Sequence, residues 1–171
     1  MVKETKTESP VLFMSEASFS YAGGHSGAGV EGISLSLGKG EVALLCGPSG
    51  CGKTTVTRLA NGLAPHFYEG TETGTVRVCG LDVAHAELWE TARFVGSVFQ
   101  NPKTQFYNVD VRGEVAFGCE NLGFEPVDIE RRVDASAKEF NLTPLIDESL
   151  FSLSGGKKQR VACASAAATS P

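Results

Sequence analysis

The chain has 171 residues, of which 42% are hydrophobic and 20% are charged, and its formal net charge is -5. This composition is typical of a soluble globular protein with one core, and the acidic balance provides no basic surface of the kind that nucleic-acid-binding proteins carry. No apolar run approaches the ~20 residues of a membrane-spanning helix, so we expect a cytosolic chain. The five cysteines are scattered without a CxxC pair, which argues against a disulfide framework or a zinc site and predicts reduced, mostly buried thiols.

Strand patterns come first along the chain. Residues 11–21 mix apolar and small polar residues, and residues 33–37 alternate strictly between the two, so both segments predict strands. Residues 41–45 form a short apolar run, which predicts a buried parallel strand. Further strands are expected at residues 75–78 and 94–99. The sequence therefore predicts a mixed α/β fold.

The most specific motif follows the apolar run. Gly47 to Thr55 reads GPSGCGKTT and fits the pattern GxxxxGK[ST] of a phosphate-binding loop. Its glycines let successive backbone N–H groups point into one concavity, and the helix that follows adds its positive end. In such a loop Lys53 reaches the β- and γ-phosphates and the Thr54 hydroxyl is a ligand of Mg²⁺. The pattern predicts a triphosphate site, with a fortuitous glycine-rich turn as the weaker alternative.

The second half of the chain has helical periodicity. Two amphipathic faces are expected, the second of them after Pro126, and their members are Val111, Val115, Cys119 and Leu122, then Ile129, Val133, Ala137 and Phe140. We expect one domain over residues 1–171, in which residues 1–105 form a β-rich core with the phosphate-binding loop. A helical subdomain over residues 106–155 and a last helix over residues 156–171 complete it.

A second glycine motif precedes this last helix. Leu153 to Arg160 reads LSGGKKQR and leads into an alanine-rich run. Ser154, Gly155 and Gly156 would lie at a helix N-terminus, where the backbone N–H groups and the helix dipole favour an anion. Taken alone, the motif is explained equally well by an N-cap serine with two turn glycines.

In this order and separation, the two glycine motifs resemble those of the ATP-binding cassette (ABC) ATPases. The resemblance covers essentially the whole chain and implies a P-loop NTPase (RecA-like) core with an antiparallel β edge and a helical signature subdomain, together with ATP and Mg²⁺ as ligands. Within this superfamily, residues 61–70 (NGLAPHFYEG) and 99–108 (FQNPKTQFYN) are similar to the ATP-binding components of energy-coupling factor importers. Those importers take up vitamins or transition metal ions.

The resemblance also implies roles for individual residues. Tyr21 would stack on adenine, although an ordinary amphipathic tyrosine at a strand end remains its alternative. Gln100 would contact Mg²⁺ and the attacking water. The loop residues that would bind the nucleotide with Tyr21 are Gly47, Ser49, Gly50, Cys51, Gly52, Lys53, Thr54 and Thr55. The signature residues that would act in trans, on a nucleotide held by a second subunit, are Leu153, Ser154, Gly155, Gly156, Lys157 and Gln159.

Members of this family work as head-to-tail pairs. The implied partners are a second ABC ATPase subunit, identical or different, and an integral membrane coupling protein at the cytoplasmic face of the membrane, with no nucleic acid. The family's next elements, an aspartate for Mg²⁺, a glutamate that acts as general base and a switch histidine, do not occur before the sequence ends at Pro171. We therefore expect a fold that is incomplete at its C-terminus, with ATP binding at most and negligible hydrolysis by this chain alone.

Two other functions remain open from the sequence. A non-transport ABC ATPase of the DNA-repair type fits the same motifs, although the acidic composition argues mildly against it. A catalytically inert, nucleotide-responsive binding module would also carry both motifs and would bind ATP without turnover. The transported solute is not encoded in either motif.

Overall fold

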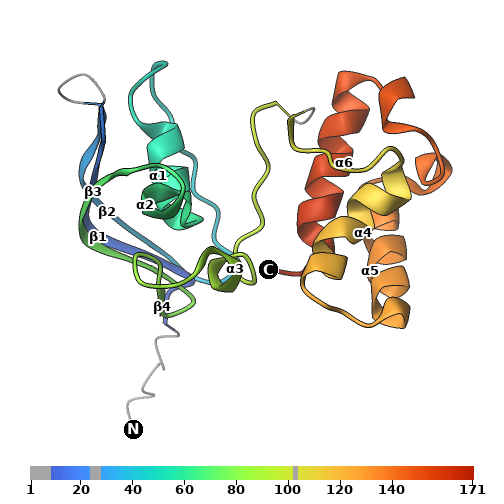
Figure 1. Ribbon diagram of the computed structural model, residues 1–171, viewed down its shortest axis with the longest axis horizontal. Helices are drawn as coiled ribbons and strands as arrows, with labels where there is room; N and C mark the ends of the chain where they lie inside the picture. The colour runs from blue at the N-terminus through green and yellow to red at the C-terminus, as the bar shows by residue number, and fades with distance from the viewer. Residues whose placement is uncertain (1–8, 24–27, 102–103) are drawn as a thin grey trace, which may run out of the picture. The chain divides into compact units, whose positions relative to one another are not determined.

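The computed structural model describes residues 9–23, 28–101 and 104–171. The chain divides into two compact units, residues 1–95 and residues 96–171. The first contains the β-sheet and the phosphate-binding loop, and the second is helical (Figure 1). The units divide between residues 95 and 96, ten residues before the subdomain boundary that was expected between residues 105 and 106. The last helix lies in the same unit as the other long helices.

The sheet of the first unit is antiparallel. Its strands are β1 (Leu12–Tyr21), β2 (Gly29–Leu37), β3 (Gly70–Val78) and β4 (Leu81–Asp82), in the order β2-β1-β3-β4. The central strand β1 pairs with β2 on one side and with β3 on the other. The strands predicted at residues 11–21, 33–37 and 75–78 are confirmed, because alternating side chains on these segments have one face to bury.

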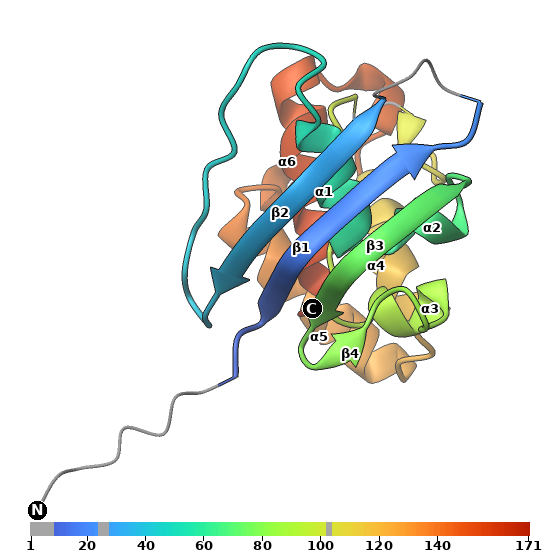
Figure 2. The same ribbon diagram turned by 90° about the vertical axis from the view of Figure 1, so that its left-hand side faces the viewer.

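Short helices cover one face of this sheet (Figure 2). They include α1 (Lys53–Ala60) and α2 (Leu63–His66), and α3 (Leu88–Thr91) follows β4. Val56 and Leu59 lie on the buried side of α1, as the helical spacing predicts. The fully buried side chains beneath these helices include Met14, Phe19, Leu59, Val76 and Val83.

Two predicted strands do not form, the parallel strand expected at residues 41–45 and the further strand expected at residues 94–99. Residues 41–45 run as an extended loop between β2 and α1, with Val42 95% and Leu44 85% exposed. Residues 94–99 are also irregular, and Phe94 and Phe99 are partly exposed. An apolar run becomes a strand only when another strand pairs with it, and within the described part of the chain the one sheet is antiparallel and includes neither segment. The strand predictions at 41–45 and 94–99 were therefore wrong.

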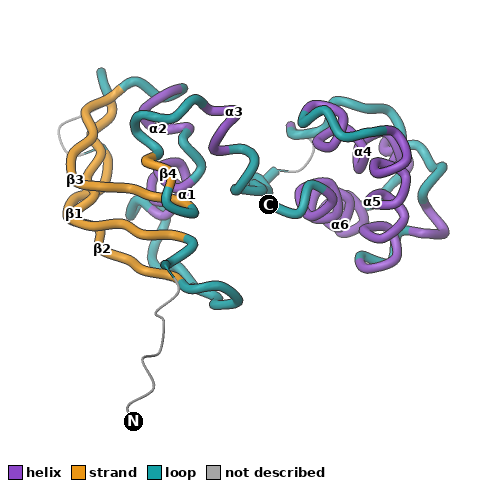
Figure 3. Tube along the Cα trace, turned by 90° about the horizontal axis from the view of Figure 1, so that it is seen from below, coloured by secondary structure: helices purple, strands orange, loops and turns teal. Residues whose placement is uncertain are grey.

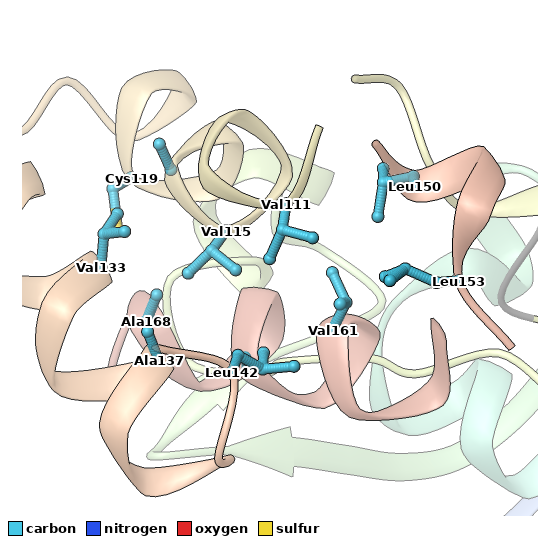
Figure 4. Close-up of a cluster of buried hydrophobic side chains, with 12 residues drawn as sticks. Val111, Val115, Cys119, Val133, Ala137, Leu142, Leu150, Leu153, Val161 and Ala168 are labelled. Atoms are coloured by element: carbon cyan, nitrogen blue, oxygen red, sulfur yellow. The ribbon is translucent and has the colours of Figure 1, made fainter. Parts of the chain in front are cut away.

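The second unit packs three helices around one core. These are α4 (Val111–Asn121), α5 (Pro126–Glu139) and α6 (Gly155–Ala168), with the 3-10 turns η2 (Thr143–Leu145) and η3 (Leu150–Ser152) between α5 and α6 (Figure 3). Their side chains meet in a buried cluster that contains Val111, Val115, Cys119, Val133, Ala137, Leu142, Leu150, Leu153, Val161 and Ala168 (Figure 4). The predicted helical faces are thus confirmed except at Leu122, which is the half-buried C-cap residue after α4 and does not belong to this cluster.

The cysteines correct another prediction. Cys46, Cys51 and Cys79 are exposed, Cys163 is half-buried and only Cys119 is buried. Cys46 and Cys51 are exposed because they lie in the open segment between β2 and α1. Burial raises the pKa of the Cys119 thiol and keeps it protonated.

None of the described helices has the length and apolarity that crossing a membrane requires.

Candidate nucleotide-binding site

The phosphate-binding loop leads directly into helix α1. Gly50 and Gly52 have φ angles of 84° and 93°, in the left-handed region that favours glycine. A Cβ on Gly52 would collide with the Val30 side chain, so the turn passes too close to β2 for any other residue. Gly52 is the N-cap of α1 and offers no side-chain cap. The first-turn N–H groups of α1 therefore have no intrahelical acceptor, which is the donor set that an anion requires.

Lys53 lies across this loop. Its Nζ donates hydrogen bonds to the carbonyl oxygens of Gly47, at 2.8 Å, and Pro48, at 2.6 Å. The same nitrogen is 3.6 Å from the Cys51 sulfur. The ammonium group is thus held at the concave loop by weak, exchangeable acceptors, and phosphate oxygens are stronger acceptors for it.

The other predicted loop residues lie around this lysine. Ser49, Cys51 and Thr54 are exposed, and the Thr54 carbonyl accepts a hydrogen bond from Thr57 Oγ1. Thr55 differs from them because it is only 6% exposed and faces the sheet. The arrangement fits a triphosphate with Mg²⁺, since it combines a glycine cradle, one cation and an exposed hydroxyl.

Tyr21 lies at the end of β1, and its hydroxyl points at α1. Its Oη is 3.1 Å from Thr55 Oγ1 and accepts a hydrogen bond of 2.9 Å from Arg58 Nη1. The ring meets Phe19 edge-on, with 4.8 Å between the ring centroids, and Tyr68 lies edge-on at 6.1 Å. The structure thus places Tyr21 beside the loop helix, and its stacking on adenine stays a prediction.

A wide hollow of about 530 Å³ lies along the sheet, and no residue of the loop 47–55 lines it. Gly29 and Val30 belong to its wall, and both are neighbours of Gly52. The remaining wall carries hydroxyl groups from β1 and β3 and one carboxylate, with the residues Ser18, Phe19, Ser20, Ala28, Glu31, Thr71 and Thr73. The hollow is therefore not assigned to the nucleotide.

The second unit presents Gln100 on an irregular segment. Gln100 is exposed, and the side chain of Gln105 braces the backbone before it. Gln105 Oε1 accepts a hydrogen bond of 3.0 Å from the Phe99 amide, and Gln105 Nε2 donates one of 3.2 Å to the Ser97 carbonyl. Sequence reasoning missed Gln105, because a side chain that closes a loop on itself leaves no periodic signal.

Glu114 anchors the next part of this segment. It is only 2% exposed, and its Oε2 accepts hydrogen bonds from the amides of Tyr107, at 3.0 Å, and Asn108, at 2.9 Å. Its own carbonyl accepts a bond of 2.8 Å from Ser165 in α6. A signal for Glu114 did exist in the sequence, since it lies on the apolar face between Val111 and Val115, where a charge needs partners.

The signature residues lie at the start of α6, as predicted. Leu153 is buried in the core, and Ser154 is the N-cap residue, with its side chain making no capping bond. A Cβ on Gly155 or Gly156 would meet nothing within 4 Å. Of the two remaining positions, Lys157 is half-buried and Gln159 is exposed. The helix N-terminus therefore presents a hydroxyl and bare backbone to an approaching group.

A family model described as ABC transporter matches residues 30–171. This chain belongs to the ABC transporter family. A protein of Treponema denticola named as an ABC transporter ATP-binding protein is 43% identical over 161 residues, which are 94% of this chain and 33% of that protein. The energy-coupling factor transporter ATP-binding protein EcfA1 of Bacillus subtilis is 39% identical over 142 residues, or 83% of this chain and 49% of EcfA1.

The solved structure of cbiO1 from Clostridium perfringens shares the fold of this ABC chain. The TM-score is 0.80 at 27% sequence identity, over 96% of this chain and 63% of cbiO1, which is described as part of the ABC transporter complex cbiONQ. The chain thus has the mixed helix-and-sheet fold of an ABC ATPase. It spans about half or less of the length of the curated relatives named here.

Proposed function

We propose that this chain is the ATP-binding part of an ABC importer and couples ATP binding and hydrolysis to the uptake of a small solute, a vitamin or a metal ion. The observation that carries the proposal is the loop of residues 47–54, where left-handed glycines, uncapped helix N–H groups and the Lys53 ammonium converge. The names of EcfA1 and of the cbiONQ complex support import by an energy-coupling factor type of transporter.

In this proposal, each residue of the loop has a defined task. The first-turn N–H groups of α1 donate to phosphate oxygens, and Lys53 exchanges its bonds with Gly47 and Pro48 for bonds to the β- and γ-phosphates. Thr54 and Gln100 are the candidate ligands of Mg²⁺, which when bound neutralises charge on the phosphates. Ser154, Gly155 and Gly156 offer their hydroxyl and N–H groups to the γ-phosphate held by a second ATP-binding subunit.

The helical unit supplies a surface for the proposed membrane partner. Tyr107 is 78% exposed and stacks on Phe117, with ring centroids 5.0 Å apart, while Phe151 is 79% exposed. A cavity of about 280 Å³ opens beside Phe151, and Lys158 contributes to its wall. Exposed aromatic residues beside a cavity are typical anchors of protein interfaces. Co-purification with an integral membrane protein, lost in Phe151→Ser, would support this assignment.

The nucleotide site is tested by calorimetric titration of the chain with Mg-ATP. Lys53→Ala is expected to abolish binding, because it removes the cation from the loop. Lys138→Ala, on the exposed side of α5, removes the same charge elsewhere and is expected to leave affinity unchanged. Unchanged affinity in Lys53→Ala would contradict the proposed function.

A further inference from the structure

A small cluster of polar and aromatic side chains joins the end of β1 to helix α1. Arg58 Nη1 donates to the Tyr21 hydroxyl at 2.9 Å, and that hydroxyl is 3.1 Å from Thr55 Oγ1. The Arg58 guanidinium carbon lies 3.8 Å from the centroid of the Tyr68 ring and 5.8 Å from that of Tyr21. Arg58, Tyr21 and Tyr68 are all half-buried.

Helix geometry explains why two side chains of α1 contact the Tyr21 hydroxyl. Thr55 and Arg58 are three residues apart in α1, so their side chains lie on the same face of the helix. Arg58 occupies one lone pair of the phenol oxygen, which leaves the phenol hydrogen or the other lone pair for Thr55. The position of the Tyr21 ring is therefore set by the helix that begins inside the phosphate-binding loop.

Arg58 can do this because its own position is fixed. Its planar guanidinium packs against the Tyr68 ring while one N–H points at Tyr21. A lysine at this position has no planar group to stack and holds no fixed fork of donors. The stacking on Tyr68 therefore restrains the donor that in turn holds Tyr21.

We propose that Arg58 is a positioning residue of the nucleotide site, which acts through the Tyr21 hydroxyl to hold the Tyr21 ring where the base binds. The inference rests on the proposed nucleotide-binding function and adds a residue that neither glycine motif contains. In this proposal Arg58 contacts Tyr21 and Tyr68 and does not itself bind the phosphates or the base. Its contribution is confined to the part of the affinity that comes from the base, because an ordered ring loses less freedom when a base stacks on it.

This separation allows a direct test with two ligands. Calorimetry would compare Mg-ATP with Mg-tripolyphosphate, which binds the loop but has no base. Arg58→Met and Tyr21→Phe are each expected to lower the ratio of ATP affinity to tripolyphosphate affinity by up to about fivefold, the limit that is reached when the whole stacking contribution of about 1 kcal/mol is lost. Tyr21→Phe keeps the ring and changes no charge. Arg77→Met, which removes an exposed guanidinium from β3, is the control and is expected to leave the ratio unchanged.

The double variant Arg58→Met with Tyr21→Phe completes the design. If Arg58 acts through the hydroxyl, the double variant loses no more than either single variant. A ratio that stays at the unsubstituted chain's value in Tyr21→Phe, or a parallel loss of both ligands in Arg58→Met, would overturn the inference while leaving the loop assignment intact. If the unsubstituted chain bound neither ligand, the proposed function and this inference would both be overturned.

Discussion

Replacement of Glu114 by alanine is expected to lower the free energy of unfolding of the helical unit by about 3 kcal/mol. The Glu114 carboxylate accepts two backbone hydrogen bonds, from Tyr107 and Asn108, and hydrogen bonds to a charged group contribute about 1.5–3 kcal/mol each. The lower end of that range applies, because Tyr107 is largely exposed and water can partly replace the lost acceptor. Relative to the 5–15 kcal/mol of a typical domain, this is a large loss.

Urea unfolding followed by far-ultraviolet circular dichroism measures this loss. Glu114→Gln is expected to fall between the parent and Glu114→Ala, because one amide oxygen can still accept both bonds but carries no charge. Glu120→Ala, on the exposed side of the same helix, is the control and is expected to change stability by less than about 0.5 kcal/mol. Glu114 does not anchor this segment if Glu114→Ala lowers the free energy of unfolding no more than Glu120→Ala, or if hydrogen exchange at the Tyr107 and Asn108 amides does not accelerate.

Two further changes test other contacts. Arg132 Nη1 donates hydrogen bonds to the carbonyls of Ala168 and Thr169 at the end of α6. Arg132→Met is therefore expected to lower the free energy of unfolding, measured in urea, by about 1–2 kcal/mol. Arg131→Met, at the exposed neighbouring residue, is the control, and equal effects of the two substitutions would contradict this role of Arg132. Burial, followed by the Asp82 charge, raises the pKa of Glu72 above the ordinary pKa of a glutamate. Between these two pKa values the folded state binds more protons than the unfolded state, so the free energy of unfolding falls as the pH rises through this range. Glu72→Gln is therefore expected to raise the thermal midpoint at pH 7 but not at pH 4, and a lower midpoint at pH 7 would contradict the burial argument.

The elements that the sequence predicted correctly are those whose own residue pattern shows which of their faces is packed against the rest of the protein. The alternation at residues 33–37 and the helical spacing of Val111, Val115 and Cys119 each define one apolar face, and the first face is half-buried while the second is fully buried in the structure. The apolar run at residues 41–45 carries an equally clear signal, but a strand also needs a partner, and no local pattern contains that information.

The same distinction separates the two halves of the candidate site. A phosphate-binding loop is encoded within consecutive residues, so the positions of Gly52, Lys53 and the start of α1 followed from the motif. The partners of Arg58 and Glu114 were not predicted, because they depend on contacts between elements that are distant in sequence. Arg58 meets a tyrosine 37 positions away, and the Glu114 carbonyl accepts from a serine 51 positions away. Only folding brings such pairs together.

The two glycines at the start of α6 have a practical consequence for protein engineering. Alanine is more favourable than glycine by up to about 1 kcal/mol per helix residue, the value for a helix interior, and a methyl group on Gly155 or Gly156 would meet no neighbouring atom within 4 Å. A search for thermostabilising substitutions that ranks variants only by their free energy of unfolding would therefore select alanine at these two positions. Such a variant would melt later while carrying side chains over the backbone that the proposed partner nucleotide approaches. Under the proposed function, thermal stability therefore favours alanine at this turn, whereas contact with the partner nucleotide favours glycine.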